Sequence, residues 1–136
     1  MQNVVVGYDG SEESRRALER AVAIGSSGGK VTVVTAVSIG AHMGGRGMGA
    51  LNEDELAAAR SSLEAAKAQL QAQGIDAHAI EGEGEPADVI TEAAREVGAD
   101  LVVVGTRGLG AAKRLVLGSV STKVVHDAPC DVLVVR

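Results

Sequence analysis

The chain has 136 residues, enough for a single hydrophobic core, and carries a net charge of −5 from 13 basic and 18 acidic side chains. This acidic balance disfavours nucleic acid and anionic membranes as partners, and a single Tyr with no Phe or Trp disfavours base stacking. Because no apolar run could span a bilayer and no leader-like segment opens the sequence, we expect one cytoplasmic domain covering residues 1–136.

The first predicted strand, Val4–Val6, is followed by a short turn and an amphipathic segment. A helix is expected from Ser11 to about Ser26, with Ser11 as its N-cap and two glutamates in the first turn, where the helix dipole favours acidic residues. The turn Gly7–Gly10 therefore follows the carboxyl end of the strand directly.

A second strand is predicted at Val31–Val37, followed by a glycine-rich segment, Ser38–Asn52. Segments of this length are usually lids, ligand contacts or disordered, and the sequence leaves these alternatives open. The next helix is expected over Glu53–Gln73, where Leu and Ala residues repeat along one stripe until Gly74.

The third strand is predicted at Ala77–Glu81 and the next helix at Pro86–Val97, which begins with Pro and stops at a glycine. Leu101–Val104 predicts a fourth strand, and Val132–Val135 predicts the last. Three of the five strands are almost continuous in Val and Leu, which is typical of strands buried on both faces of a sheet. The alternation of strands and helices predicts an open parallel α/β sheet with right-handed crossovers.

The last helix, Ser119 to about Asp127, is preceded by a glycine-rich loop. Two residues separate Gly105 from Gly108, and nine residues separate Gly108 from Gly118. Ser119 follows directly, and we expect it to be the N-cap of the last helix. Free N–H groups at a helix N-terminus, with nearby hydroxyl groups, can hold a phosphate, and glycines let a ligand approach the backbone. The alternative is that these glycines only serve turns.

Ligands of open parallel sheets bind beyond the carboxyl ends of the strands. If the first and fourth strands are neighbours, Asp9 and Gly105 face one crevice, where the Asp9 carboxylate could accept hydrogen bonds from ribose. The alternative is that Asp9 is a turn residue at the start of the first helix, and both roles can coexist.

Other candidate sites carry weaker signals. Gly28-Gly29-Lys30 resembles the end of a P-loop but enters a strand, and the acidic residues of the Gly82–Ala87 segment oppose a dinucleotide. The histidines show no ligand spacing and no Ser or Cys has an evident His and carboxylate partner, so we expect no metal site and no catalytic residue. Cys130 precedes an apolar run, which favours a packed thiol over a reactive one.

Over essentially the whole chain, the sequence resembles the universal stress proteins. The resemblance is carried by five segments: Val4–Ser11, Gly84–Pro86, Gly98–Gly108, Leu117–Ser121 and Ala128–Val135. It implies a Rossmann-like sheet in the order 3-2-1-4-5, like that of the adenine nucleotide alpha hydrolases, with helices on both faces, and a homodimer. The last strand, Val132–Val135, would then lie at an edge of the sheet, and because an exposed apolar edge tends to pair, we expect the homodimer to form through this C-terminal strand.

The family's ATP-binding branch carries the glycine pattern that this chain keeps at Gly105, Gly108, Gly118 and Ser119. The resemblance therefore implies ATP, or AMP or ADP, accompanied by Mg²⁺. It places Asp9 on ribose, the adenine beside Gly7 to Asp9 and Ala36, the length of the nucleotide along Val104, Gly105, Arg107 and Gly108, and the phosphates on Gly118, Ser119, Val120 and Ser121. Tyr8 departs from the usual smaller residues and packs either on adenine or on the sheet.

The resulting prediction is an ATP-binding regulator of the stress response. The alternatives are a sensor of AMP or cyclic AMP, a slow ATPase, and a dimeric interaction module without a ligand. An ATPase requires a residue that orients the attacking water, and the sequence does not identify one.

Overall fold

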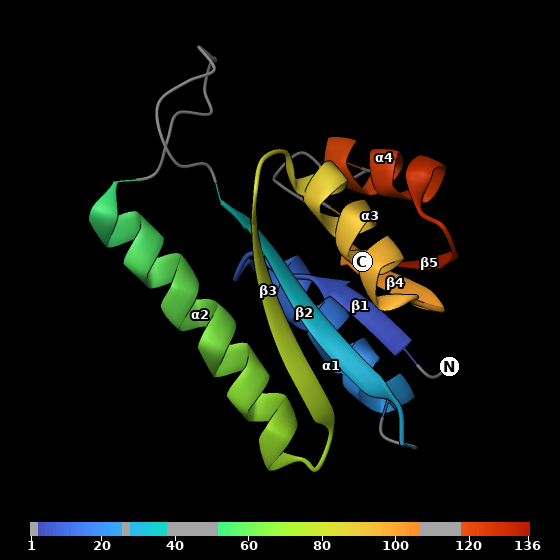
Figure 1. Ribbon diagram of the computed structural model, residues 1–136, viewed down its shortest axis with the longest axis horizontal. Helices are drawn as coiled ribbons and strands as arrows, with labels where there is room; N and C mark the ends of the chain where they lie inside the picture. The colour runs from blue at the N-terminus through green and yellow to red at the C-terminus, as the bar shows by residue number, and fades with distance from the viewer. Residues whose placement is uncertain (1–2, 26–27, 38–51, 107–117) are drawn as a thin grey trace.

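The computed structural model describes residues 3–25, 28–37, 52–106 and 118–136. Its centre is a five-stranded sheet in which all neighbouring strands are parallel, in the order β3-β2-β1-β4-β5 (Figure 1). This confirms the order that the family resemblance implies. The strands are β1 (Asn3–Gly7), β2 (Lys30–Val37), β3 (Asp76–Glu83), β4 (Leu101–Gly105) and β5 (Asp131–Val135).

Helices cover both faces of the sheet, as expected (Figure 1). Residues of α1 and α2 share one buried cluster with the sheet, and residues of α3 and α4 share the other. None of the helices among the described residues has the length and apolar character needed to cross a bilayer. The helices are α1 (Glu12–Gly25), α2 (Glu53–Ala72), α3 (Pro86–Val97) and α4 (Ser119–Asp127).

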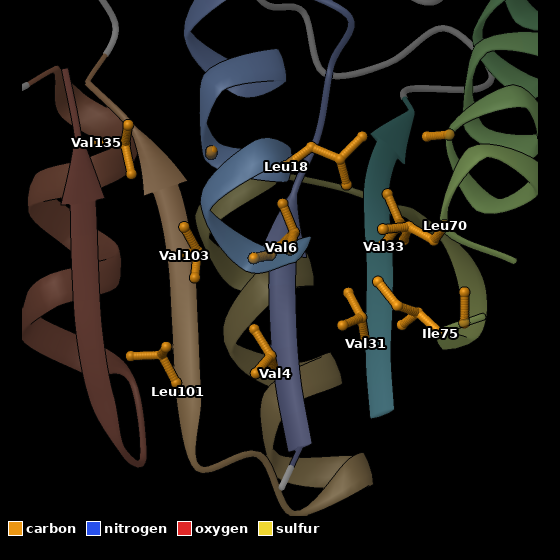
Figure 2. Close-up of a cluster of buried hydrophobic side chains, with 14 of the residues drawn as sticks. Val4, Val6, Leu18, Val31, Val33, Leu70, Ile75, Leu101, Val103 and Val135 are labelled. Atoms are coloured by element: carbon orange, nitrogen blue, oxygen red, sulfur yellow. The ribbon is translucent and has the colours of Figure 1, made fainter. Parts of the chain in front are cut away.

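Successive side chains of a strand point to opposite faces of the sheet, and both faces are buried here, so the strand sequences are nearly continuous apolar runs. In β1, Val4 and Val6 belong to the cluster beneath α1 and α2, whereas Val5 belongs to the cluster beneath α3 and α4. Figure 2 shows Val4 and Val6 beside Leu101 and Val103 of β4 in the first of these layers. Since both faces are buried, most positions of these central strands are apolar.

Local signals set the helix limits close to their expected positions. The Ser14 N–H donates to Ser11 Oγ at 3.2 Å, which confirms Ser11 as the N-cap of α1. Asn52 and Glu55 form a reciprocal capping box at the start of α2. Gly98 has φ +66° and ends α3 in the left-handed conformation that glycine adopts readily.

Candidate functional site

A pocket of about 150 Å³ lies at the carboxyl ends of β1 and β4. The chain leaves β1 toward α1 on one face of the sheet and enters β4 from α3 on the other face, so this is the point where the winding direction reverses. Its walls come from the ends of β1, β2 and β4 and from the first turns of α1, α3 and α4. The lining residues are Gly7, Tyr8, Asp9, Ser11, Glu13, Ser14, Val34, Ala36, Pro86, Ile90, Val104, Gly105, Thr106, Val120 and Ser121.

The structure brings most of the residues predicted from sequence to this pocket. Gly118 and Ser119 begin the helix that contributes one wall, although they do not line the pocket themselves. Arg107, Gly108 and nearly all of the Ser38–Asn52 segment lie outside the described residues. The predicted residues that line the pocket are Gly7, Tyr8, Asp9, Ala36, Val104, Gly105, Val120 and Ser121.

Hydrogen bonds to neighbouring elements fix the turn after β1. The Tyr8 N–H donates to the Val34 carbonyl at 2.9 Å, and the buried Thr35 hydroxyl donates to the Tyr8 carbonyl. Tyr8 also packs against the cluster beneath α1 and α2, so its ring contacts the sheet layer as well as the pocket. These bonds hold the backbone that presents Asp9.

The Asp9 side chain takes part in the turn. Its Oδ1 accepts the Ser11 N–H at 2.9 Å, and its own N–H donates to Ser14 Oγ at 3.3 Å. Asp9 is exposed and lines the pocket, and a carboxylate there could accept hydrogen bonds from ribose hydroxyls. The turn role is therefore present in the structure, and the ribose role stays a prediction.

The position of Gly105 has a reason that the sequence does not show. A Cβ atom built there would lie 2.7 Å from Glu13 Cβ and 2.8 Å from the Glu13 carbonyl carbon and oxygen. Glycine at this position therefore lets the first turn of α1 approach β4, where the sequence suggested the approach of a ligand. At Gly7 the corresponding Cβ would meet the tip of the Ile90 side chain at 2.7 Å.

The N-terminus of α4 differs from its expected form. Gly118, with φ −74° and ψ 172°, is the N-cap, so the prediction that Ser119 occupies this position is wrong. The Ser121 and Thr122 hydroxyls both donate to the Gly118 carbonyl, at 3.2 and 2.9 Å, and no side chain of the described residues caps the N–H groups. A helix start of this kind offers its first N–H groups to an external acceptor.

Charge distinguishes α4 from the other helices. α1, α2 and α3 each carry at least one acidic residue in the first turn, whereas α4 carries none. The positive end of its dipole is therefore not balanced by a carboxylate of its own first turn. Since Val120 and Ser121 line the pocket, this end of α4 favours an anionic group there.

Several pocket residues were not predicted from sequence. Pro86 and Ile90 of α3 form a wall with Val34 of β2, and Ser14 of α1 supports the turn after β1. Their positions follow from α3 crossing the sheet beside β1 and β2, which only the strand order reveals. The buried polar Ser14 was the available signal, because it interrupts the apolar stripe of α1.

Cys130 follows the last helix and is half-buried. Burial raises the pKa of its thiol, and the Asp131 and Asp100 carboxylates add to this effect. A raised pKa lowers the thiolate fraction at neutral pH, which agrees with the expectation of a packed thiol.

A doubly wound sheet with a pocket at its switch point defines a protein of the open, parallel α/β class. The model of the universal stress protein family matches residues 1–136, and the chain belongs to this family.

Similar proteins agree with this assignment. A universal stress protein of Thermus aquaticus, found in the QAH/OAS sulfhydrylase 3′ region, is 37% identical, with 99% of this chain and 98% of the relative covered. Universal stress protein YxiE of Bacillus subtilis is 33% identical over 98% of this chain and 97% of its own length. A universal stress protein solved in complex with cAMP is 35% identical with a TM-score of 0.74, covering 99% of this chain and 96% of that one.

Proposed function

We propose that this chain is an ATP-binding universal stress protein that acts as a nucleotide-dependent regulator of the stress response. The observation that carries the proposal is the N-terminus of α4, whose N–H groups no side chain among the described residues caps and which opens on the same pocket as Asp9. One end of the pocket therefore suits phosphate and the other suits ribose. These two features support an adenine nucleotide as the ligand.

Each part of the nucleotide has a proposed partner. The adenine lies beside Gly7, Tyr8 and Ala36, where Val34, Ile90 and Val104 supply apolar surface. Asp9 accepts bonds from ribose. The N–H groups at Gly118, Ser119, Val120 and Ser121, with the Ser119 hydroxyl, hold the phosphates, and Val104, Gly105, Arg107 and Gly108 follow the length of the ligand.

We propose that Mg²⁺ arrives with the phosphates. Among residues 3–25, 28–37, 52–106 and 118–136, no group of three His, Cys, Asp or Glu side chains could hold a metal ion. Mg²⁺ commonly keeps several waters and is bound partly by phosphate oxygens, so a dedicated protein cage is not required. The described acidic residues that line the pocket are Asp9 and Glu13, whose carboxylates could supply further oxygen ligands.

A sensor of cyclic AMP or AMP is the second candidate. It is favoured by the relative that was solved in complex with cAMP and is 35% identical to this chain. Such ligands carry fewer phosphates and therefore depend less on α4. A slow ATPase is the enzymatic alternative, but we assign no catalytic residue, because it would need a group that orients water at the γ-phosphate.

We expect the purified protein to bind ATP with a Kd on the order of micromolar, because several charge-assisted hydrogen bonds to phosphate act together. Isothermal titration calorimetry with ATP, AMP and cAMP would measure and rank the affinities. Absence of a heat signal at millimolar ATP, with the protein shown to be folded by circular dichroism, would contradict the proposal.

The proposal also covers the cellular location of the protein and its oligomeric state. We propose a single domain that acts in the cytoplasm as a homodimer joined through β5. β5 lies at an edge of the sheet with Val132, Leu133 and Val134 partly exposed, and an open apolar edge is prone to pair with another strand. Because α4 leads directly into β5, nucleotide at the start of α4 could influence how β5 pairs.

The dimer predicts a specific effect of proline in β5. The Val135 carbonyl accepts the Thr106 N–H, so Val135 faces β4, and alternation turns the Val134 N–H toward the open edge. Val134→Pro should therefore convert a dimer into a monomer while the β4 ladder remains. Small-angle scattering of both proteins would test this, and a wild-type protein that is monomeric at high concentration would refute pairing through β5.

A further inference from the structure

Lys123 of α4 connects the two helices that wall the phosphate side of the pocket. Its Nζ lies 3.1 Å from Asp88 Oδ1 and 3.4 Å from Glu85 Oε1, both at the start of α3. Figure 1 shows α3 and α4 side by side on one face of the sheet. The pairing of one ammonium with two carboxylates raises the pKa of Lys123, so it stays charged at neutral pH.

These carboxylates lie close to the pocket without lining it. Pro86, which stands between Glu85 and Asp88, lines the pocket from α3, and Ser121 lines it from α4, two residues before Lys123. The Glu85 and Asp88 carboxylates therefore lie near the first turns of α4, because the side chain of Lys123 in that helix contacts both of them. The electrostatic repulsion between a carboxylate and a phosphate that lie within one Debye length, about 10 Å at 0.1 M ionic strength, is only partly screened by salt.

We propose that Lys123 determines how many phosphate charges the site accepts, because its positive charge offsets part of the negative charge of Glu85 and Asp88 beside the phosphate-binding turn of α4. This inference rests on the proposed nucleotide function. Lys123 is a positioning and charge-compensating residue rather than a direct ligand, since its ammonium is engaged by α3. The three side chains are exposed, so their effect on folding stability is small.

The consequence depends on ligand charge. Without Lys123, Glu85 and Asp88 lose the ammonium that pairs with them, and their repulsion of a bound nucleotide grows with the number of phosphates. We expect Lys123→Met to weaken ATP binding about tenfold at 0.1 M salt and to weaken cAMP binding, with its single phosphodiester charge, less than about twofold. Raising the salt to 1 M, where the Debye length is about 3 Å, should remove most of the ATP effect.

Calorimetry on wild type and variants tests the proposal. Lys67→Met is the matched control, because Lys67 also pairs with a carboxylate, Glu64, but lies on α2, which contributes no described pocket residue. It should leave both affinities unchanged. Adding Glu85→Gln and Asp88→Asn to Lys123→Met should restore ATP affinity, which would not happen if Lys123 bound phosphate directly.

The outcomes are distinguishable. Equal weakening of ATP and cAMP by Lys123→Met, an equal effect of Lys67→Met, or failure of the two neutralising changes to restore ATP affinity would each overturn the charge-compensation proposal while the nucleotide function stands. Wild-type protein that is folded but binds neither ligand would overturn the proposed function and this inference together. The charge-compensation proposal is supported if Lys123→Met weakens ATP binding more than cAMP binding and if adding Glu85→Gln and Asp88→Asn restores the ATP affinity.

Discussion

Gly118→Asp should abolish most ATP binding while slightly stabilising the protein. The backbone of Gly118 is extended, at φ −74°, so an aspartate can adopt it, and as an N-cap its carboxylate would accept hydrogen bonds from the first N–H groups of α4. Those donors would then be unavailable to phosphate, and the new charge would repel it. We expect about a 100-fold loss of ATP affinity, since hydrogen bonds to charged groups contribute about 1.5–3 kcal/mol each.

Gly118→Asp is expected to lower ATP affinity and to raise folding stability, so a variant that is merely misfolded would not give the predicted result. Asp is a somewhat better N-cap than Gly, by a few tenths of a kcal/mol, so thermal unfolding should show equal or greater stability. Calorimetry should show a smaller loss for cAMP than for ATP. Gly118→Asn, which caps without adding charge, separates the blocking of donors from repulsion.

Asn52→Asp is the matched control for Gly118→Asp. It adds a negative charge at the N-cap of α2, and Asn52 is absent from the described pocket lining. Its nucleotide affinity should equal that of the wild type. Unchanged ATP affinity in a folded Gly118→Asp protein would show that phosphate binds elsewhere.

Gly105→Ala should destabilise the fold by about 1–3 kcal/mol, the usual cost of adding atoms to a closely packed site. The added methyl group would be 2.7–2.8 Å from the Glu13 backbone and Cβ, and the backbone cannot rotate away. Because α1 must shift, the turn that presents Asp9 should also move. Urea unfolding would measure the loss of stability, and calorimetry would measure the accompanying loss of nucleotide affinity.

Gly7→Ala serves as the comparison for Gly105→Ala. Its methyl group would meet chiefly the flexible end of Ile90, at 2.7 Å from Cδ1, and side-chain rotation can relieve that contact. Gly7→Ala should therefore cost less stability, although both glycines end neighbouring strands at the same pocket. If the two variants unfold at the same urea concentration, the close approach of α1 to β4 does not explain Gly105.

Local physical chemistry made the strands and helix limits predictable from sequence. Runs such as Leu101–Val104 indicate strands buried on both faces, and capping by Ser11 or termination at Gly98 depends on residues near in the chain. The order of the strands came from family resemblance, because alternation of strands and helices indicates a parallel sheet without saying which strands are neighbours.

The sequence by itself determined a parallel α/β domain with Asp9 and the start of the last helix as candidate ligand groups, since these signals are encoded within a few residues. Only the tertiary structure decided that Gly105 accommodates α1, that Ile90 walls the pocket, and that Lys123 pairs with Glu85. Each of these contacts joins elements distant in the chain, so it depends on how the sheet arranges its helices and could not follow from local pattern.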